Sequence, residues 1–295
     1  MTIESGSTSY DPRYVEARRV LLDALIALAP HASAVIVAGA QAIYLQTGDA
    51  GVAIAPYTTD GDLALDPTIL GDDPNLEAAM ASAGLTRLTS PRGHSEPGTW
   101  VANARLGGED VVIPVDLIVP QALGKPGKRG GARLGSHGKQ AAHLVPGIEA
   151  VLVDHQPMTI KALDPADTRS LDVKVAGVAA MLVAKAHKIH DREVGGKSHR
   201  QDDKDASDVV RLMQTTSPTD VAVTLADLMT HAMAGESTAD GVRYLDELFG
   251  RRSGRGIVMA TRALEFGIPA AAVETLSVSY TGRLLEALRE QSIPT

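Results

Sequence analysis

The spacing of hydrophobic residues predicts that the chain opens with an amphipathic helix and a buried strand. Apolar side chains recur at helical spacing through residues 12–29, and Pro30 ends the run. The β-branched residues 35–37 then predict a short strand. Gly39 follows at a turn, and residues 40–45 return to helical spacing. The expected order is helix, strand, glycine turn and helix.

The pattern of the next hundred residues predicts further strands. Residues 60–65 alternate between two sets of side chains, as a strand does, and residues 74–84 have helical spacing. Two more strands are expected at 99–105 and 111–119, because the intervening LGGED has the glycine chemistry of a hairpin turn. A strand at 156–162 is expected to complete this half.

The periodicity changes in the second half of the chain. From residue 173 onward the apolar spacing is helical almost to the end. We therefore expect two domains with a boundary near residue 168: a mixed α/β domain over 1–168, with a mixed sheet flanked by helices, and a helical domain over 169–295. Breaks between helices are expected at residues 195–196, 216–220 and 267–269.

The composition is that of a folded globular protein and limits its possible sites. Of the 295 residues, 44% are hydrophobic and 22% are charged, and no apolar run is long enough to span a membrane. The first residues lack the apolar core of a signal peptide, so we expect a cytoplasmic protein without membrane contacts. The absence of cysteine excludes disulfides and thiolate ligands, which leaves carboxylates and histidines as metal ligands.

The charge distribution favours local rather than general contacts with nucleic acid. A net charge of −8 opposes coating of a phosphate backbone, and aromatic residues for base stacking make up only 3% of the chain. Residues 121–148 nevertheless form a glycine-rich stretch that has basic residues and no acid. This stretch is either an ordinary solvated loop or a binding surface for an acceptor polynucleotide. Its basic residues are Lys125, Lys128, Arg129, Arg133 and Lys139, and a second cluster comprises Arg251, Arg252 and Arg255.

Three aspartates are the candidate catalytic centre. Asp60 and Asp62 are two positions apart on the expected strand, so their carboxylates would share a face and converge on a divalent cation. Asp116 is the one acid in the apolar segment VVIPVDLIVP and would add a third ligand. Three such carboxylates suit the two-metal sites of phosphoryl and nucleotidyl transfer. The alternative is a solvated turn at Asp60 and Asp62, with Asp116 a hydrogen-bonded buried acid.

The order of these motifs resembles a known superfamily. A strand, a glycine turn, a helix, a D-x-D strand and a later strand with a single acid are similar to the nucleotidyltransferases related to DNA polymerase beta. More narrowly, VAGAQAIYL, TTDGDLAL, PVDLIVP, LVAKAHKIHDR and DDKDASDVVRLM resemble the AbiEii and MenT group of bacterial toxins. The resemblance covers roughly residues 30–215.

The resemblance implies a set of site residues and a magnesium cofactor. It implies that the three aspartates hold Mg²⁺ and that Lys185, the lysine of LVAK, binds the triphosphate. Asp205 and Asp208 would contact either that lysine or the nucleotide. The sequence departs from the family at Ala40, which has no hydroxyl for the γ-phosphate, so backbone N–H groups must serve there. The implied catalytic residues are Asp60, Asp62, Asp116, Lys185 and Asp205. The implied nucleotide-binding residues are Gly39, Ala40, Thr58, Lys185, Lys188 and Asp208.

The resemblance also implies a biological role. Such an enzyme would transfer a nucleotide from an NTP substrate to the 3′ end of tRNA, which blocks aminoacylation and growth. Its partners would be tRNA and a cognate antitoxin, which in this family includes kinases that phosphorylate a hydroxyl residue. Thr58 or Thr59 occupies that position, and a phosphate there would compete with Asp60 for the metal.

Other interpretations of these residues remain open. The chain is alternatively a non-catalytic RNA-binding adaptor or antitoxin, or a nucleotidyltransferase that acts on a protein or small molecule. His190 and Asp191 are a candidate metal-hydrolase pair that needs more distant ligands. The basic helix around Lys185 is alternatively a solvated face, and the charged run before Asp208 an N-terminal helix cap.

Overall fold

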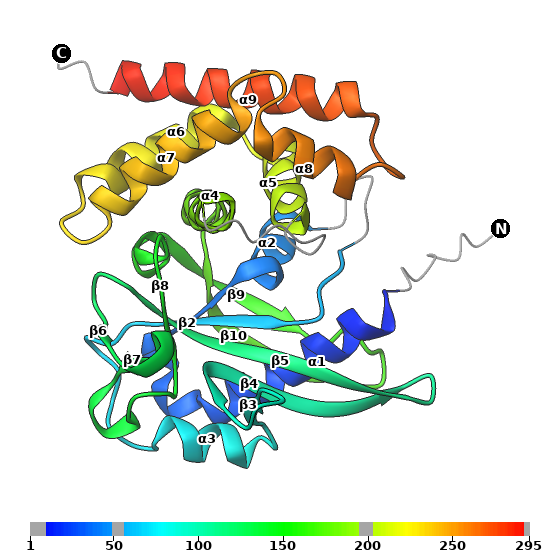
Figure 1. Ribbon diagram of the computed structural model, residues 1–295, viewed down its shortest axis with the longest axis vertical. Coiled ribbons are helices and arrows are strands. Elements are labelled where there is room, and N and C mark those ends of the chain that lie inside the picture. Colours follow the sequence, from blue (N-terminus) through cyan, green and yellow to red (C-terminus); the bar gives the residue numbers. More distant parts are fainter. Residues whose placement is uncertain (1–9, 49–55, 195–202, 292–295) are drawn as a thin grey trace.

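The protein is a mixed α/β structure built on one large sheet. A computed structural model describes residues 10–48, 56–194 and 203–291. The sheet has eight strands in the order β3-β4-β5-β2-β1-β10-β9, with β8 beside β5 (Figure 1). Its strands are β1 (Val35–Ala38), β2 (Gly61–Leu65), β3 (Thr86–Thr89), β4 (Ser95–Leu106), β5 (Glu109–Pro120), β8 (His143–Val145), β9 (His155–Lys161) and β10 (Ser170–Ala176).

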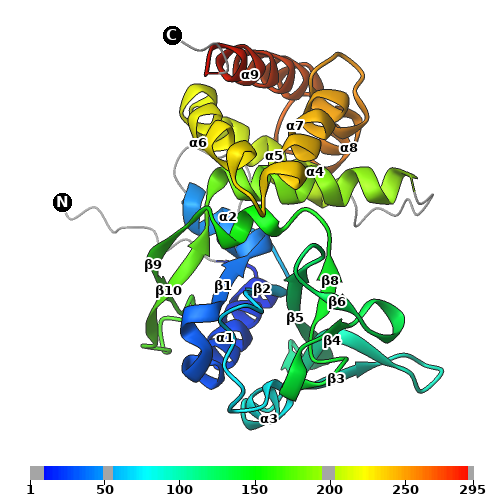
Figure 2. The same ribbon diagram turned by 90° about the vertical axis from the view of Figure 1, so that its left-hand side faces the viewer.

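Helices cover the sheet, and those that follow it in sequence form a separate region (Figures 1 and 2). The first three are α1 (Pro12–Ala27), α2 (Gly39–Thr47) and α3 (Leu76–Ser82). The C-terminal helical region contains α4 (Val178–Val194), α5 (Asp203–Thr215), α6 (Pro218–Thr230), α7 (Gly235–Phe249), α8 (Arg255–Ala263) and α9 (Ala270–Gln291). No helix in the three described ranges has both the length and the apolar composition to cross a membrane.

The two faces of the sheet carry different side chains, because successive residues of a strand point to opposite faces. Leu63 and Leu65 of β2 are fully buried on the face that packs against α1, where Leu21 touches Gly61. The intervening Asp62 and Ala64 therefore point to the opposite face, toward α4. The same alternation places Asp116 of β5 on that opposite face, because Asp62 and Asp116 are paired across the two parallel strands.

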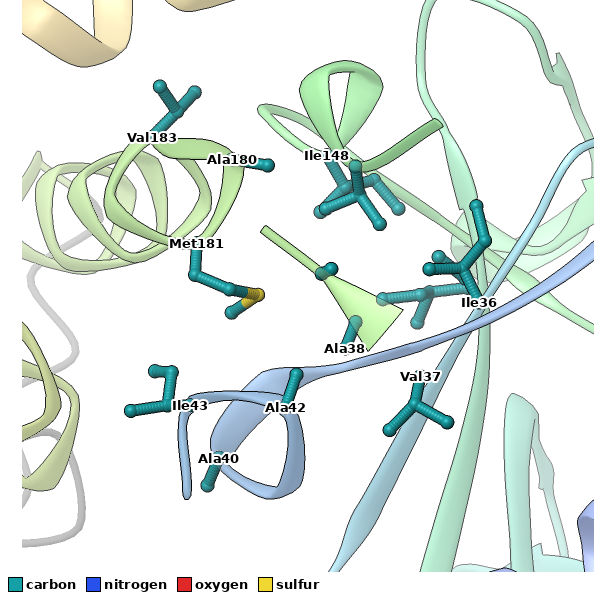
Figure 3. Close-up of a cluster of buried hydrophobic side chains, with 14 of the residues drawn as sticks. Ile36, Val37, Ala38, Ala40, Ala42, Ile43, Ile148, Ala180, Met181 and Val183 are labelled. Carbon is teal, nitrogen blue, oxygen red and sulfur yellow. The ribbon is translucent and has the colours of Figure 1, made fainter. Parts of the chain in front are cut away.

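The region between the sheet and the helical region is filled by small and medium apolar side chains (Figure 3). Ala42 and Ile43 of α2 are completely buried, and Met181 of α4 points toward them. Ile148, from the turn that precedes the short 3₁₀ helix Glu149–Leu152, adds to the same cluster. This continuous core fixes α4 over the acid-bearing face of the sheet.

Local signals explain where the site-forming helices begin and end. The side chain of Asp11 accepts a hydrogen bond from the Arg13 N–H, and Pro12 starts α1. Gly48, at φ 60°, ends α2. The start of α4 is capped by a residue that lies well before it in the sequence: the Asp154 carboxylate accepts a hydrogen bond from the Ala180 N–H at 2.9 Å.

The structure confirms most expected elements and corrects several. The expected helical start at residue 173 is wrong: Ser170–Ala176 is β10, which pairs with β1 in parallel and with β9 in antiparallel fashion. Val173 and Val175 favour this extended backbone because they are β-branched. The expected break at 195–196 lies outside the described residues, whereas those at 216–220 and 267–269 are confirmed.

The glycine-rich basic stretch has more structure than expected. Lys125–Pro126 (β6) and Ala132–Arg133 (β7) form a two-stranded ribbon, and β8 follows it. A proline in a strand is typical of a sheet edge or a bulge, yet Pro114 lies on β5, which is an interior strand. The proline is tolerated because pairing with β2 begins only at Val115, so at Pro114 the strand is bonded on the β4 side alone.

Candidate active site

Two of the predicted acids are neighbours at the centre of the sheet. Asp62 on β2 and Asp116 on β5 are register partners, and both are only partly buried. Paired residues on adjacent strands point to the same face at close range, so these carboxylates share one site. Asp60 directly precedes β2, and its charge raises the pKa of both other acids, which places it within electrostatic range of them.

Gly39, at the junction of β1 and α2, lies directly against the Asp62 side chain. Ala38 at the end of β1 is the register partner of Asp62, and Gly39 follows with φ +64°. A Cβ at Gly39 would lie 1.7 Å from Asp62 Oδ2. Glycine is therefore required here by both the left-handed backbone and the adjacent carboxylate.

The negative charges of Asp62 and its neighbouring aspartates destabilise one another, and a bound cation would offset them. Burial, followed by the charge of Asp60, raises the pKa of Asp62 to about 6. Burial also raises the pKa of Asp116, against a hydrogen bond from the Thr99 side chain. The Oδ1 atom of Asp116 is buried without a hydrogen-bond partner among the described residues. The charges of both acids are therefore only partly compensated.

This donor set fits a hard cation. In the described ranges, no three or more histidine, cysteine, aspartate or glutamate side chains are arranged to hold a metal ion. Asp62 and Asp116 nevertheless offer carboxylate oxygens, the ligands that Mg²⁺ prefers, and one of these oxygens is without a partner. The residues thus fit magnesium, while the full three-acid metal site stays a prediction.

Asp60 is held by its own loop and by α2. The buried hydroxyl of Thr58 donates a hydrogen bond to the Asp60 carboxylate. Gln41 of α2 donates to the Asp60 carbonyl at 3.3 Å, and the Tyr44 hydroxyl donates to the Tyr57 carbonyl at 2.8 Å. Thr58 is 1% exposed, whereas Thr59 is partly exposed.

The N-terminus of α2 provides backbone donors next to the acids. Its cap residue Ala38 makes no side-chain capping hydrogen bond, and Ala40 in the first turn is buried. The first N–H groups of a helix have no intrahelical acceptor and suit an anion. The absence of a hydroxyl at residue 40 leaves this binding to the backbone.

Lys185 is the buried cation of the site. It is 4% exposed on α4, and its Nζ lies 2.5 Å from Asp205 Oδ1 and 2.7 Å from Asp208 Oδ2, both on α5. Burial alone would lower the pKa of Lys185, but the two carboxylates raise it well above its usual value. The predicted role of Asp205 and Asp208 in orienting Lys185 therefore has a direct geometric basis.

Lys188 is more accessible than Lys185. Its side chain is 44% exposed, and its Nζ is 3.4 Å from Asp205 Oδ1. Its positive charge lowers the pKa of Asp62 and of Asp116, so it lies within electrostatic range of both acids. This combination of exposure and proximity suits an incoming polyphosphate.

Other cations complete the network at α5. Arg192 Nη1 lies 2.6 Å from Asp205 Oδ2, and Lys204 Nζ lies 3.3 Å from Asp208 Oδ2. The Tyr44 hydroxyl oxygen of α2 also lies 3.3 Å from Asp208 Oδ1, so its single proton is shared between this carboxylate and the nearer Tyr57 carbonyl. The charged run at the start of α5 is thus more than a helix cap, because its aspartates bind cations from α4.

The two predicted clusters of basic residues lie in different parts of the structure. Arg129 is exposed with a left-handed backbone, φ 55°, whereas Arg133 on β7 donates from Nε to the Pro126 carbonyl. The Lys128 side chain is outside the described residues. In the second cluster, Arg252 pairs with Glu274 at 3.5 Å and Arg255 with Glu193 at 2.9 Å, so both are paired with acids.

The alternative metal site at the end of α4 receives no support from its surroundings. The His190 ring stacks on Tyr244 with centroids 3.7 Å apart, and its Nδ1 is 3.8 Å from Asp191 Oδ1. Within the described part of the chain, these residues belong to no group of three metal-holding side chains.

Sequence reasoning missed three polar residues near the acids. Thr99 of β4 is the register partner of Asp116, and His143 of β8 is the partner of Ile118 on the same face. Tyr44 joins α2 to Asp208. Alternation on the expected strand 99–105 could have indicated Thr99, whereas nothing in the glycine-rich stretch indicated that His143 lies in a strand.

Comparison of the sequence with protein families finds no match, and comparison with curated proteins finds none either.

Proposed function

We propose that this protein is a magnesium-dependent nucleotidyltransferase that transfers NMP from an NTP to the 3′ end of an RNA, most specifically tRNA. The observation that carries the proposal is the pairing of Asp62 with Asp116 directly beside Gly39 and the α2 N-terminus. Two facing carboxylates next to backbone anion donors suit phosphate chemistry.

The residues divide the binding of the nucleotide between them. Lys188 and the first N–H groups of α2 bind the triphosphate, and the buried Lys185 adds a fixed positive charge within electrostatic range of Asp62. Asp205 and Asp208 keep Lys185 protonated and hold its ammonium group in one place. Bound Mg²⁺, held by Asp62 and Asp116 with Asp60, would offset the charge of the phosphates and of the leaving group.

The reaction needs one proton transfer. The 3′-hydroxyl oxygen of the acceptor bonds to the α-phosphorus, and the bond from that phosphorus to the bridging β-phosphate oxygen breaks, which releases pyrophosphate. Asp116 accepts the hydroxyl proton as a general base, and its Oδ1 is unpaired within the described residues.

The biological role that we propose is that of a toxin. Addition of nucleotides to the 3′ end of tRNA would prevent aminoacylation and so arrest translation. A cognate antitoxin would silence the enzyme. A phosphate on the Thr58 hydroxyl, which donates a hydrogen bond to Asp60, would compete with that carboxylate for the metal and repel the triphosphate. The resemblance of the motifs to AbiEii and MenT toxins supports this role.

The proposal is tested by binding and by transfer. Isothermal titration of NTP with Mg²⁺ should show metal-dependent binding, and incubation with total tRNA and each labelled NTP in turn should label the RNA. Asp62→Asn and Asp116→Asn should abolish transfer, whereas Asp172→Asn, at an exposed position of β10, should leave it intact. Transfer that persists in both site variants would reject the mechanism. Metal-independent RNA binding without transfer would favour a non-catalytic adaptor.

A further inference from the structure

A pocket of about 480 Å³ opens beside the acids, between β4, the turn after β6 and β8. Its volume lies in the range of small-ligand sites. The lining includes polar side chains that offer both donors and acceptors. The lining residues that the argument uses are Ser95, Glu96, Thr99, Arg129 and His143.

Three lining residues connect this pocket to the catalytic acids. Thr99 is the register partner of Asp116, and its side chain hydrogen-bonds to Asp116 and lowers its pKa. Glu96 lies close enough to act electrostatically on Asp116. His143 is close enough to Asp62 for the carboxylate to act on the imidazole. The pocket therefore adjoins the point where the two acids meet.

The sheet order places this pocket opposite the phosphate-binding elements. The strands run β4-β5-β2-β1, with the acids on the two central strands. Gly39 and the α2 N-terminus follow β1 on one side, whereas the pocket lies at β4 and β8 on the other. A molecule in the pocket would thus approach the acids from the side away from the α2 N-terminus.

His143 is held so that one nitrogen is left for a ligand. Its Nδ1 lies 3.2 Å from the Pro97 carbonyl, which can only accept, so in the neutral ring Nδ1 carries the proton and Nε2 is an acceptor. The ring packs on Gly98, where a Cβ would lie 2.5 Å from His143 Nδ1. Such an imidazole can accept a hydrogen bond from a ribose hydroxyl.

Arg129 supplies the positive charge of the pocket. Its side chain is exposed and makes no ion pair within the described residues. Its left-handed backbone, φ 55°, is uncommon for a residue other than glycine. A guanidinium group that is free of carboxylates suits a phosphodiester.

We propose that this pocket receives the 3′-terminal ribonucleotide of the acceptor RNA. His143 Nε2 accepts from a ribose hydroxyl, Arg129 binds the adjoining phosphodiester, and Ser95 and Glu96 face the base. This assignment rests on the proposed nucleotidyl transfer and specifies where its second substrate binds.

The test separates the two substrates by steady-state kinetics of the full-length protein with labelled NTP and total tRNA. Arg129→Gly suits the backbone at that position, and His143→Gln keeps an acceptor of different reach. We expect each to raise KM for tRNA about tenfold, with KM for NTP changed by less than about twofold. Lys161→Ala is the control, because it removes one exposed positive charge from β9, at the opposite edge of the sheet from β4. An unchanged KM for tRNA, or a raised KM for NTP, would overturn the assignment.

A second measurement is independent of catalysis. An RNA oligonucleotide with a photoreactive 3′-terminal uridine should crosslink to residues 90–99 or 129–144, as mapped by mass spectrometry. Crosslinks confined to other segments would overturn the pocket assignment. If the wild-type protein neither binds NTP with Mg²⁺ nor labels tRNA, the proposed function fails, while crosslinks at this pocket would still identify it as an RNA-end site.

Discussion

The carboxylate of Asp62 fills the space that a side chain on Gly39 would occupy. The gap between Asp62 Oδ2 and a Cβ built on Gly39 is only 1.7 Å, and this contact joins the end of β1 to the acid-bearing strand. The position of Asp62 thus depends on the absence of a single carbon atom at residue 39.

Gly39→Ala is therefore expected to displace Asp62 and to abolish nucleotide transfer. The variant must also hold alanine in a left-handed backbone, which costs about 1–2 kcal/mol before the clash is counted. Transfer assays and thermal unfolding would measure both effects. Gly48→Ala is the matched control at the other end of α2, because Gly48 has φ +60° with nothing within 4 Å of the added carbon. It should lose stability and keep transfer; equal activity in both variants would contradict the role of the contact.

Lys185→Met should destabilise the fold strongly. The change leaves the carboxylates of Asp205 and Asp208 buried without their central cation, and such a break typically costs about 3–5 kcal/mol. Chemical denaturation would give the free energy of unfolding. The triple variant with Asp205→Asn and Asp208→Asn should recover part of the loss, because it removes two buried carboxylates that have lost their closest shared cation; no recovery would argue against charge as the cause.

Lys188→Ala should separate binding from stability. The side chain is 44% exposed, so its removal should change the free energy of unfolding by less than about 0.5 kcal/mol. It should nevertheless weaken NTP binding, because Lys188 is an accessible cation within electrostatic range of Asp62 and Asp116. Titration calorimetry would measure the affinity. Unchanged affinity would remove Lys188 from the triphosphate site.

Stability without metal should fall as pH rises through the titration range of Asp62. The folded protein holds the Asp62 proton up to a pKa of about 6, above the value of 3.8 for an unperturbed aspartate. A raised acid pKa stabilises the fold below the unfolded value, and this contribution is lost between about pH 4 and 6, amounting to at most about 3 kcal/mol. Asp62→Asn should therefore raise the melting temperature at pH 7.5 and have little effect at pH 4.

Magnesium should act in the same direction as this substitution. A cation that offsets the two ionised carboxylates should stabilise the wild-type protein at pH 7.5 and have less effect at pH 4, where Asp62 is protonated. Thermal unfolding with and without Mg²⁺ would show the difference. The same stabilisation in Asp62→Asn would mean that the ion binds elsewhere.

Thr58→Val should remove a hydrogen bond that holds the Asp60 carboxylate in place. The substitution keeps the volume of the buried side chain and removes the hydroxyl that donates to the Asp60 carboxylate, which should cost about 1 kcal/mol of unfolding free energy. Thr59→Val, at a partly exposed neighbour, is the control and should cost less. Denaturation curves would compare the two, and an equal loss in both would show that the hydrogen bond contributes nothing.

Local patterns predicted the elements of the site better than their contacts. The strand, the glycine turn and the helix around Gly39 follow from spacing and turn chemistry. The contact between Gly39 and Asp62 depends on the register of β1 against β2, which joins residues far apart in sequence. His143 escaped notice because β8 is only three residues long, and β10 because its short apolar run preceded a helix without a clear break.

The resemblance placed Lys185 among the functional residues, but its environment required the structure. The sequence shows a lysine on one helix and aspartates about twenty residues later, with no indication that α4 and α5 cross at that point. The ion pairs at 2.5 and 2.7 Å arise from that crossing. Side chains that meet through helix packing are not encoded by local periodicity.

The junction between β10 and α4 divides the parts of the site. Asp62 and Asp116 precede Gly177, whereas Lys185 and its two aspartates follow it, and Tyr44 reaches across to Asp208. Proteolytic cleavage at this junction would leave the acids on one fragment and the lysine on the other. Neither fragment would contain a complete centre, so the minimal unit for any reconstitution must include both halves of the chain.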